Sequence, residues 1–542
     1  MNARERGTTV SDALLELLAR RGVDTVFGVP GNHTVTLYRH LERHGIRHVT
    51  CRHEQGAAFM ADGYARASGR PGVCVLIGGP GLLNAATGIA QARADSVPML
   101  VLTAVGAVAD LGMGRGTLHE LPDQHAAAAA FCRTSHTLLA AANLENLIER
   151  AFAGFASGRP GPAHLQIPLD LMEAERPGLA TRGSVLSPPG ADPAITAMAA
   201  ERLIRARAPL ILVGGGAAHA GSEITALAER LDCPVLNTVN GKGICPASHP
   251  LAAGGSPSLP SLRRAMAEAD VLLAVGTELG ETDYDLLMTG PLAPHPGLIR
   301  LDIDAEQLLI PFPPAIGITT DAATGVRALC AMLPDSLSRN GAERAAALRR
   351  DVRAEPHYHP EIAGFFAALE AGAPGAVIVG DSTRPTYYAA WQLERERPRS
   401  YFHSVSGFGT LGYALPAAVG AALAQEAPVI ALIGDGGLQF TLPELGTAAA
   451  LGLPLAVVVW QNQGYREIEN SMRARNVPAE ATHIRSADLE AAARAHHALY
   501  ARAASPEALT TLLRTAFGHE RPTLIEVSEA DLLTRPSGGW YG

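Results

Sequence analysis

Two short polar stretches in the C-terminal part of the chain carry side chains that bind hard metal ions. Asp435 lies in GDGG at 434–437, and Asn462 lies in QNQGY at 461–465. A carboxylate, a side-chain amide oxygen and the backbone carbonyl of Gly464 are ligands that suit Mg²⁺ or Ca²⁺. Phosphate oxygens usually complete a Mg²⁺ shell and glycine N–H groups at a helix start bind phosphate, so these stretches predict a metal-bridged diphosphate. The alternative is structural, with Asp435 capping a helix and Asn462 closing a turn.

Each of these stretches follows a short apolar run that predicts a buried parallel strand. The runs are Pro428–Ile433 and Leu455–Trp460, and Thr441–Leu451 between them has the spacing of a helix. This order of strand, loop, helix and strand places both polar stretches at the carboxyl ends of neighbouring strands. Open α/β sheets bind their ligands at that edge.

The spacing of these residues resembles a known cofactor signature. GDG, a gap of 25 residues, and then Asn462 and Gly464 are similar to the thiamine-diphosphate motif of the pyruvate decarboxylase and acetolactate synthase superfamily. The resemblance implies that Asp435, Asn462 and the Gly464 carbonyl hold Mg²⁺ on the diphosphate of thiamine diphosphate. Two positions depart from the family pattern: Gln461 stands where a first Asn is more frequent, and Arg466 stands where a Gly is common.

The resemblance implies further cofactor contacts. GFGTLGYALPAA at 407–418 is similar to the family's cofactor-bending segment, in which the Gly409 carbonyl would accept from the 4′-amino group and Leu411 would separate the two rings. Residues 381–383 follow an apolar strand and would form a second diphosphate cradle or cap a helix. The predicted cofactor-binding residues are Gly409, Leu411, Asp381, Ser382, Thr383, Gly434, Asp435, Gly436, Gly437, Asn462, Gly464 and Tyr465.

A glutamate in the N-terminal part of the chain is the predicted partner of the cofactor's other ring. Glu54 follows the predicted strand Ile46–Cys51 and precedes the helical segment AAFMADGYARASG. In the family a Glu hydrogen-bonds the aminopyrimidine ring and thereby helps to remove the C2 proton, and Glu54 in RHEQGAAFMADGYARASG occupies that place. The alternative is a glutamate that only complements the helix dipole.

Candidate residues on the substrate side come from two N-terminal loops. GNHT offers His33, and RGTLHELPDQH offers His119, Glu120 and Gln124. After decarboxylation a group must return a proton to the reacting carbon, and a histidine suits this task because its charge changes near neutral pH. The alternative is that these loop histidines are solvated.

From Glu54 to Pro98 the chain aligns without gaps with its own C-terminal part at an offset of 356 residues. Where the second copy has Asp435 the first has Gly79, so only one copy can hold the metal. The register predicts two α/β domains of one design. The positions that match include Gly56, Ala58, Ala61 and Ala65 on Gly412, Ala414, Ala417 and Ala421.

Length and composition predict three domains. A chain of 542 residues exceeds a single core, and 47% apolar with 18% charged residues is typical of globular α/β proteins. We expect three doubly wound parallel-sheet domains, the first and third of the same design, at 1–173, 194–333 and 361–533. The net charge of −9 provides no basic surface for nucleic acid or anionic membranes.

The middle segment carries no dinucleotide fingerprint. Its GGGAAHAG at 214–221 is a poor match to GxGxxG, and the arginine-bearing loops with which acetolactate synthases hold FAD are not found. We therefore expect no FAD, and a dehydrogenase function would require nicotinamide binding. The six cysteines lack metal spacing, and neither a signal peptide nor a membrane span is indicated, so we expect a cytoplasmic protein.

The resemblance extends from Thr8 to about Val527, and GVPGNHTVTLY, GRGTLHELPDQ and VGTELGETD are most similar to the branch of 5-guanidino-2-oxopentanoate decarboxylase. It implies decarboxylation of a 2-oxo acid to an aldehyde. Arg466 would repel a guanidinium, a charge that Glu467 or Glu469 can offset. Alternatives are a carboligase of acetolactate synthase type, which forms a 2-hydroxyketone, and a cofactor-binding scaffold without turnover.

The resemblance also implies an assembly. In the family Glu54 and Asp435 would come from different subunits, so we expect a homodimer at least, or a homotetramer, with a small 2-oxo acid as the remaining partner. The tail RPSGGWYG has no fold signal, and either disorder or coverage of the active site is compatible with it.

Overall fold

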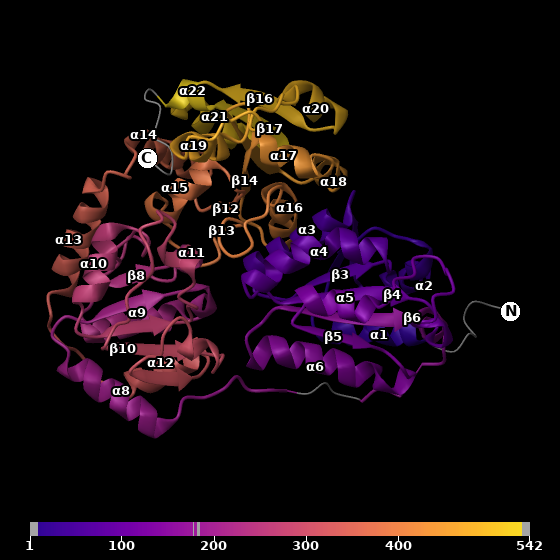
Figure 1. The fold of residues 1–542 in the computed structure, drawn as a ribbon, viewed down its shortest axis with the longest axis horizontal. Helices are drawn as coiled ribbons and strands as arrows, with labels where there is room; N and C mark the ends of the chain where they lie inside the picture. Colours follow the sequence, from indigo (N-terminus) through magenta and orange to yellow (C-terminus); the bar gives the residue numbers. More distant parts are fainter. Residues whose placement is uncertain (1–8, 177, 181–184, 534–542) are drawn as a thin grey trace. The chain divides into compact units, whose positions relative to one another are not determined.

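The computed structural model describes residues 9–176, 178–180 and 185–533, and the tail RPSGGWYG lies outside them. The chain forms two compact units (Figure 1). The first contains the described residues up to Ser187 together with Phe408–Glu426 and Thr441–Leu453. The second contains the described residues of Pro188–Gly407, Ala427–Phe440 and the part that follows Pro454.

The first unit contains a six-stranded parallel sheet with the strand order β2-β1-β3-β4-β6-β5. Every residue of its strands β3 and β6 is buried, because helices cover both faces (Figure 1). The strands are β1 Thr25–Gly28, β2 Arg47–Thr50, β3 Gly72–Leu76, β4 Met99–Val105, β5 Thr134–Thr137 and β6 Pro162–Pro168. The helices are α1 Val10–Arg20, α2 Val35–Tyr38, α3 Glu54–Ser68, α4 Pro80–Ala94, α5 Gln124–Phe131, α6 Leu144–Ser157, α7 Leu169–Met172, α16 Ala414–Ala424 and α18 Glu444–Ala450.

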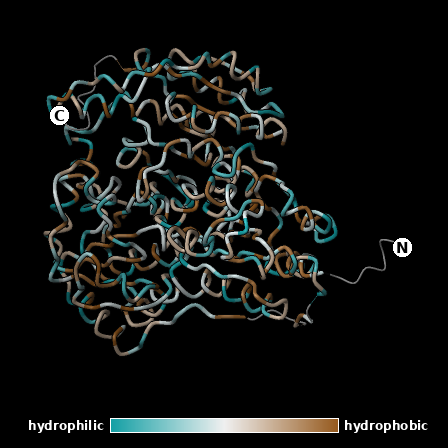
Figure 2. Tube along the Cα trace, turned by 45° about the vertical axis from the view of Figure 1, so that its right-hand side comes forward, coloured by the Kyte–Doolittle hydropathy of each residue, from teal (hydrophilic) through white to brown (hydrophobic). Residues whose placement is uncertain are grey.

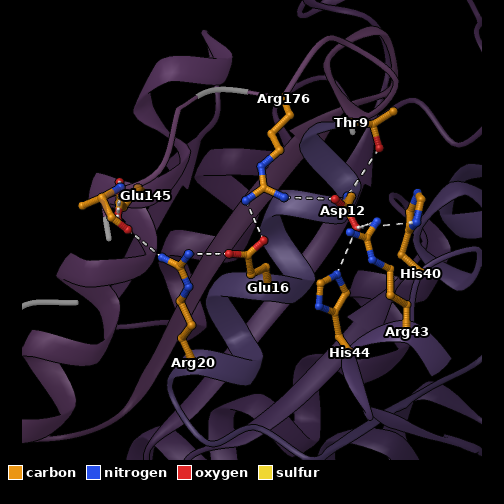
Figure 3. Close-up of polar contacts among 10 residues, drawn as sticks. Thr9, Asp12, Glu16, Arg20, His40, Arg43, His44, Glu145 and Arg176 are labelled. Carbon is orange, nitrogen blue, oxygen red and sulfur yellow. Dashed lines mark hydrogen bonds and ion pairs between the residues drawn. The ribbon is translucent and has the colours of Figure 1, made fainter. Parts of the chain in front are cut away.

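A buried carboxylate fixes helix α1 within this unit (Figure 3). Asp12 is fully buried and accepts from His44 Nε2 at 2.9 Å, Arg176 Nη1 at 3.1 Å and Arg43 Nη1 at 3.2 Å. Arg176 also contacts Glu16 at 2.5 Å. Burial alone would raise the pKa of Asp12, but the hydrogen bond from His44 and the charge of Arg43 hold it below its usual value. The contacts join α1 to the turn after α2 and to the segment that follows the first sheet.

The second unit contains the other two sheets. The middle sheet has five parallel strands in the order β11-β10-β9-β7-β8. Its strands are β7 Leu210–Val213, β8 Val235–Asn237, β9 Leu272–Val275, β10 Leu298–Asp302 and β11 Ile316–Thr319, and its helices are α8 Pro193–Arg205, α9 Gly221–Leu231, α10 Pro260–Glu268, α11 Glu281–Tyr284 and α12 Ala322–Cys330.

The C-terminal sheet has six parallel strands in the order β13-β12-β14-β15-β17-β16. Its strands are β12 Val377–Gly380, β13 Tyr401–His403, β14 Val429–Gly434, β15 Leu455–Gln461, β16 Leu499–Ala503 and β17 Thr523–Ser528. The remaining helices are α13 Gly341–Ala354, α14 Pro360–Gly372, α15 Arg384–Gln392, α17 Asp435–Thr441, α19 Arg466–Ala474, α20 Leu489–Ala495, α21 Pro506–Ala516 and α22 Glu529–Leu532.

The first and C-terminal sheets have the same topology, which confirms the predicted repeat. Substituting each strand of one sheet by its counterpart reproduces the order of the other. At the offset of 356 residues β4, Met99–Val105, falls residue for residue on β15, Leu455–Gln461. Three doubly wound parallel sheets are thus confirmed. In Figure 2 hydrophobic segments (brown) alternate with hydrophilic segments (teal) along the trace. The buried hydrophobic residues form a core around each sheet.

One predicted helix is different in the structure. The helix expected over Thr441–Leu451 is present as α18, which starts at Glu444, and an additional helix, α17, covers the preceding residues Asp435–Thr441. Pro443 separates them because its ring restricts the preceding residue and removes a backbone donor. Gly452, at φ +66°, then follows α18.

All six cysteines are unpaired. Within the described part of the chain, no helix combines the length and hydrophobicity that crossing a bilayer requires.

Candidate active site

Asp435 and Asn462 lie at the same edge of the C-terminal sheet. Asp435 is the first residue of α17, directly after β14, and Asn462 directly follows β15. The two strands are neighbours, with Gly434 opposite Trp460. The carboxyl-end placement predicted for both residues is therefore present in the structure.

The Asp435 carboxylate is only 2% exposed, and one of its oxygens is held by protein groups. Oδ2 accepts from the backbone N–H of Gln463 at 3.0 Å and from the hydroxyl of Ser486. Among the described residues none donates a hydrogen bond to Oδ1. One oxygen is thus fixed in orientation while the other is available to a cation.

The Asn462 amide is oriented by a carboxylate that follows β17. Its Nδ2 donates to Oε2 of Glu529 at 3.3 Å, an oxygen that also accepts from Trp460 Nε1 at 2.8 Å. Glu529 Oε1 accepts from Arg384 at 2.6 Å. The amide oxygen of Asn462 is buried without a hydrogen-bond partner among the described residues. A buried acceptor without a donor is the contact that a bound metal ion would satisfy, so the donor set fits Mg²⁺.

Glycines leave space beside these two residues. Gly464 is at φ +153°, and a Cβ there would lie 2.4 Å from the Thr482 carbonyl oxygen. A Cβ at Gly437 would lie 2.8 Å from Asp381 Oδ1, and one at Gly434 would lie 3.0 Å from Thr383 Oγ1. The turn after β14 therefore packs against the segment after β12, which brings together the two predicted halves of a diphosphate cradle.

Other predicted cofactor residues border the same turn or lie in the first unit. A Cβ at Gly436 would lie 2.9 Å from Tyr465 Cε1. The Ser382 N–H donates to Asp381 Oδ1 at 2.9 Å. Gly409, at φ +72°, and the half-buried Leu411 belong to the first unit. Their contact with the cofactor stays a prediction.

Glu54 is the first residue of α3 and is 8% exposed. Its Oε2 accepts from Asn84 Nδ2 of α4 at 3.0 Å. The preceding residue, His53, caps the helix through its side chain, which accepts from the Gln55 N–H at 3.1 Å. Glu54 is therefore held at the start of a long helix, with one oxygen bonded and the helix dipole favouring its charge.

A second glutamate lies directly behind this helix start. Glu444 of α18 is 1% exposed, and its Oε1 accepts from the N–H groups of Arg52 and His53 at 3.0 Å each. A Cβ at Gly56 would lie 2.2 Å from that oxygen, so only glycine leaves room for it. Burial raises the pKa of Glu444, although the hydrogen bonds from Thr447 and from the two N–H groups oppose the shift.

The structure brings together the two predicted histidines. His33 Nδ1 lies 3.4 Å from His119 Nδ1, and the ring centroids are 4.7 Å apart. His119 has a left-handed backbone at φ +63°. Burial and the nearby charge of His119 lower the pKa of His33, so His33 is neutral near pH 7.

Glu120 and Gln124 are both held by hydrogen bonds to other protein groups, Glu120 within its own loop and Gln124 to residues distant in the sequence. Glu120 is bonded to its own loop, accepting from the N–H groups of Arg115 at 3.2 Å and Thr117 at 3.0 Å, which lowers its pKa. Gln124 is 4% exposed; its Oε1 accepts from Gly79 N–H at 2.8 Å and its Nε2 donates to Thr103 Oγ1 at 3.0 Å. Through these contacts the Gln124 side chain joins the start of α4 to strand β4. Catalytic roles for Glu120 and Gln124 stay predictions.

The guanidinium of Arg466 forms an ion pair with a glutamate of the same helix. Its Nη1 lies 2.8 Å from Glu469 Oε2, and Glu469 is 2% exposed. Glu467 instead contacts Arg384 Nε at 2.9 Å through one oxygen, and its Oε2 is buried without a hydrogen-bond partner among the described residues.

Several residues that hold the site were not found from the sequence: Asn84, Glu444, Ser486, Glu529 and Arg384. Each lies far along the chain from the residue that it contacts. Chain spacing carries no signal for such pairs.

The chain matches known proteins along most of its length. Domain models of thiamine pyrophosphate (thiamine diphosphate) enzymes match it at residues 8–127 for the N-terminal TPP binding domain, 196–329 for the central domain and 379–527 for the C-terminal TPP binding domain. A "Probable 2-ketoarginine decarboxylase" of Pseudomonas aeruginosa is 41% identical over 97% of this chain and 95% of that protein.

Acetolactate synthases are also similar. The large subunit of Parasynechococcus marenigrum is 34% identical over 83% of this chain and 75% of its own length. The isozyme 2 large subunit of Escherichia coli is 32% identical over 83% of this chain and 82% of its own. The predicted superfamily is confirmed by these matches. The chain belongs to the thiamine pyrophosphate enzyme family.

Proposed function

We propose that this protein catalyses the non-oxidative decarboxylation of a 2-oxo acid to an aldehyde, with thiamine diphosphate and Mg²⁺. The observation that carries the proposal is the buried Asn462 Oδ1, which has no hydrogen-bond partner among the described residues. It lies at the end of the strand next to the one that Asp435 follows, where the family's cofactor signature lies. When bound, thiamine diphosphate supplies the electron sink that a departing carboxylate requires.

The metal ligands would be Asp435 through Oδ1, Asn462 through its amide oxygen, and the carbonyl of Gly464. Ser486 and Glu529 would not bind the metal themselves. They would orient its ligands, because Ser486 hydrogen-bonds Asp435 and Glu529 hydrogen-bonds Asn462. Glycines at 434, 436 and 437, together with Asp381, Ser382 and Thr383, would receive the diphosphate at the start of α17.

Glu54 would carry the proton exchange at the cofactor's pyrimidine ring. Asn84 holds Oε2, which leaves Oε1 to face the ligand. Glu444 holds the backbone before Glu54 in place and would keep the carboxylate at a fixed position.

His33 and His119 would return the proton to the reacting carbon. Their Nδ1 atoms lie 3.4 Å apart, and the lowered pKa of His33 favours its neutral ring, which can accept a hydrogen bond from His119.

For the substrate we propose a 2-oxo acid with a cationic side chain. The relative from Pseudomonas aeruginosa is named for 2-ketoarginine, which is 5-guanidino-2-oxopentanoate. Glu469 neutralises Arg466. Glu467 Oε2 has no hydrogen-bond donor in the described part of the chain, and a guanidinium could supply one.

The test is a panel of 2-oxo acids assayed with thiamine diphosphate and Mg²⁺, with product analysis. Aldehyde and CO₂ from 5-guanidino-2-oxopentanoate, with slower turnover of neutral and acidic analogues, is the expected result. The similarity to acetolactate synthases favours a second candidate, carboligation, which would instead produce a 2-hydroxyketone. Loss of C2–H exchange in Glu54→Gln without any loss of biological function would support the scaffold alternative.

We also propose a homodimer at least, in which Glu54 of one subunit serves the cofactor bound by the partner. Glu54→Gln and Asp435→Ala would each be inactive. Coexpressed, they would form mixed dimers with one intact site, and a random mixture would recover roughly a quarter of wild-type activity because symmetric dimers pair at random. A mixture with no recovery would contradict the shared site.

A further inference from the structure

A second group of charged side chains lies in the second unit and shares no residue with the candidate cofactor site. Lys242 is its most confined member, at 4% exposed. No described residue accepts a hydrogen bond from its ammonium group, and its electrostatic partner is Glu394. Burial lowers the pKa of Lys242 to about 8, while Glu394 opposes that shift. An ammonium buried without acceptors carries a desolvation cost that a bound anion would offset.

Lys242 lines the narrow end of a two-part cavity. The inner part, of about 20 Å³, has room for a single water molecule. It adjoins an outer part of about 450 Å³, a size typical of small-molecule sites. The two parts share the lining residues Gly254, Arg349, Leu393, Glu394 and Arg395.

The wall of the cavity is formed by two segments in direct contact. Ala247 N–H donates to the Arg395 carbonyl at 3.1 Å, and Ser248 N–H donates to Glu396 at 3.0 Å. Gly243, at φ +79°, approaches so closely that a Cβ would lie 2.1 Å from the Arg397 carbonyl oxygen. These two segments therefore form one closely packed wall of the cavity.

The outer part contains more cations than carboxylates. Its charged residues are Arg349, Arg353, Arg395 and Arg397 against Glu370, Glu394 and Glu396. Glu370 is paired with Arg395 at 3.0 Å, and Glu396 is bonded to Ser248 at 2.7 Å.

The remaining cations have unused donors. Arg349 and Arg397 each donate to backbone carbonyls through one nitrogen, Arg349 to Ala252 and Pro250 and Arg397 to Gly375. Arg353 has no hydrogen bond or ion pair within the described part of the chain. An excess of cations here, in a protein of net charge −9, is a local field suited to an anion.

We propose that this cavity binds a small organic dianion, with Lys242 at its inner end and Arg349 and Arg353 at its outer end. Phosphate monoesters and dicarboxylates share the required charge. The site is independent of the decarboxylation proposed above.

Calorimetric titration of the enzyme loaded with thiamine diphosphate and Mg²⁺ tests this site. The probes are malonate for the dicarboxylates and adenosine monophosphate for the phosphate esters, with sodium chloride at equal ionic strength as the reference. We expect saturable binding of at least one probe to the wild type. Hydrogen exchange should slow in 242–255 and 391–400 when that probe is bound.

Variants separate this site from nonspecific binding. Arg353→Gln should weaken binding about two- to fivefold, the effect of losing one exposed charge contact, and Lys242→Met should abolish it. Arg350→Gln is the matched control, because Arg350 is exposed on the same helix and does not line the cavity. Absence of binding by both probes, or equal binding by the wild type and Arg353→Gln, would overturn the proposal even if Lys242→Met fails to fold.

Discussion

His53 and Glu444 lie 391 positions apart in the sequence, yet the His53 N–H donates to Glu444 Oε1 at 3.0 Å. The same oxygen accepts from the Arg52 N–H at 3.0 Å, so one buried carboxylate satisfies the backbone immediately before Glu54. A helix from the C-terminal half of the sequence thus fixes the predicted proton-exchanging residue of the N-terminal half.

Replacing Glu444 with alanine should both destabilise the first unit and reduce activity. Two buried N–H groups would lose their acceptor, at a cost of about 2–4 kcal/mol, and Glu54 would lose its fixed position. Glu444→Gln keeps an acceptor oxygen and should be milder in both respects. Calorimetric unfolding and steady-state rates provide the measurement, with exposed Glu426→Ala as the control; equal behaviour of Glu444→Ala and Glu426→Ala would refute this role.

The raised pKa of Glu444 also predicts a pH dependence. The folded state binds this proton more tightly than the unfolded chain does, so the contribution of Glu444 to the free energy of unfolding is greatest at low pH. It should decrease as pH rises from the ordinary carboxyl pKa through the raised value. The difference in unfolding temperature between the wild type and Glu444→Gln, measured against pH, should change over that interval and be flat outside it.

Glu529→Gln should weaken Mg²⁺-dependent cofactor binding without removing a proposed metal ligand. Glu529 orients Asn462 and at the same time accepts from Trp460 and Arg384, and a neutral amide cannot replace all three contacts. Loss of such an outer contact typically lowers metal affinity by about 10–100-fold. Titration of thiamine diphosphate at varied Mg²⁺ measures the effect, and exposed Glu520→Gln is the control. An unchanged Mg²⁺ requirement in Glu529→Gln would exclude this contribution.

His119→Asn should raise the pKa of His33. Burial is the main cause of the lowered pKa and would remain, but the neighbouring charge of His119 would be gone. The proton titration of His33, followed by nuclear magnetic resonance of ¹⁵N-labelled histidine, should move to higher pH. Activity should fall by about 10²-fold or more, as expected for loss of a general acid. If the His33 titration does not move, the charge of His119 does not lower the pKa of His33 in solution.

Much of the fold could be predicted from local patterns. The apolar runs of β14 and β15 predict strands, and the helix between them predicts that the two strands pair in parallel, as they do. The start of α17 at Asp435 did not follow, because Gly436 and Gly437 have a low helix propensity and locally favour a loop. Asp435 and Asn462 were found because a motif joins them. Ser486, 51 positions from Asp435, was not, because only a folded loop brings its hydroxyl to the carboxylate.

Asp12→Asn should destabilise the first unit strongly. The variant would remove a negative charge that lies among Arg43, Arg176 and His44, while leaving the cations in place (Figure 3). Breaking a buried pair in this way costs about 3–5 kcal/mol, and the partial exposure of Arg43 should place the effect at the lower end. Glu173→Gln is the control, since its 3.5 Å contact with Arg39 is between exposed side chains and should contribute less than about 1 kcal/mol.

The lowered pKa of Asp12 determines the sign of its pH dependence. The unfolded chain binds this proton more readily, so the stabilisation is complete above the ordinary carboxyl pKa and is lost as pH falls through the lowered value. Acid unfolding of the wild type, monitored by hydrogen exchange in α1, should begin in that interval. Asp12→Asn should lack this dependence, and an acid transition of unchanged slope in Asp12→Asn would show that another carboxylate controls it.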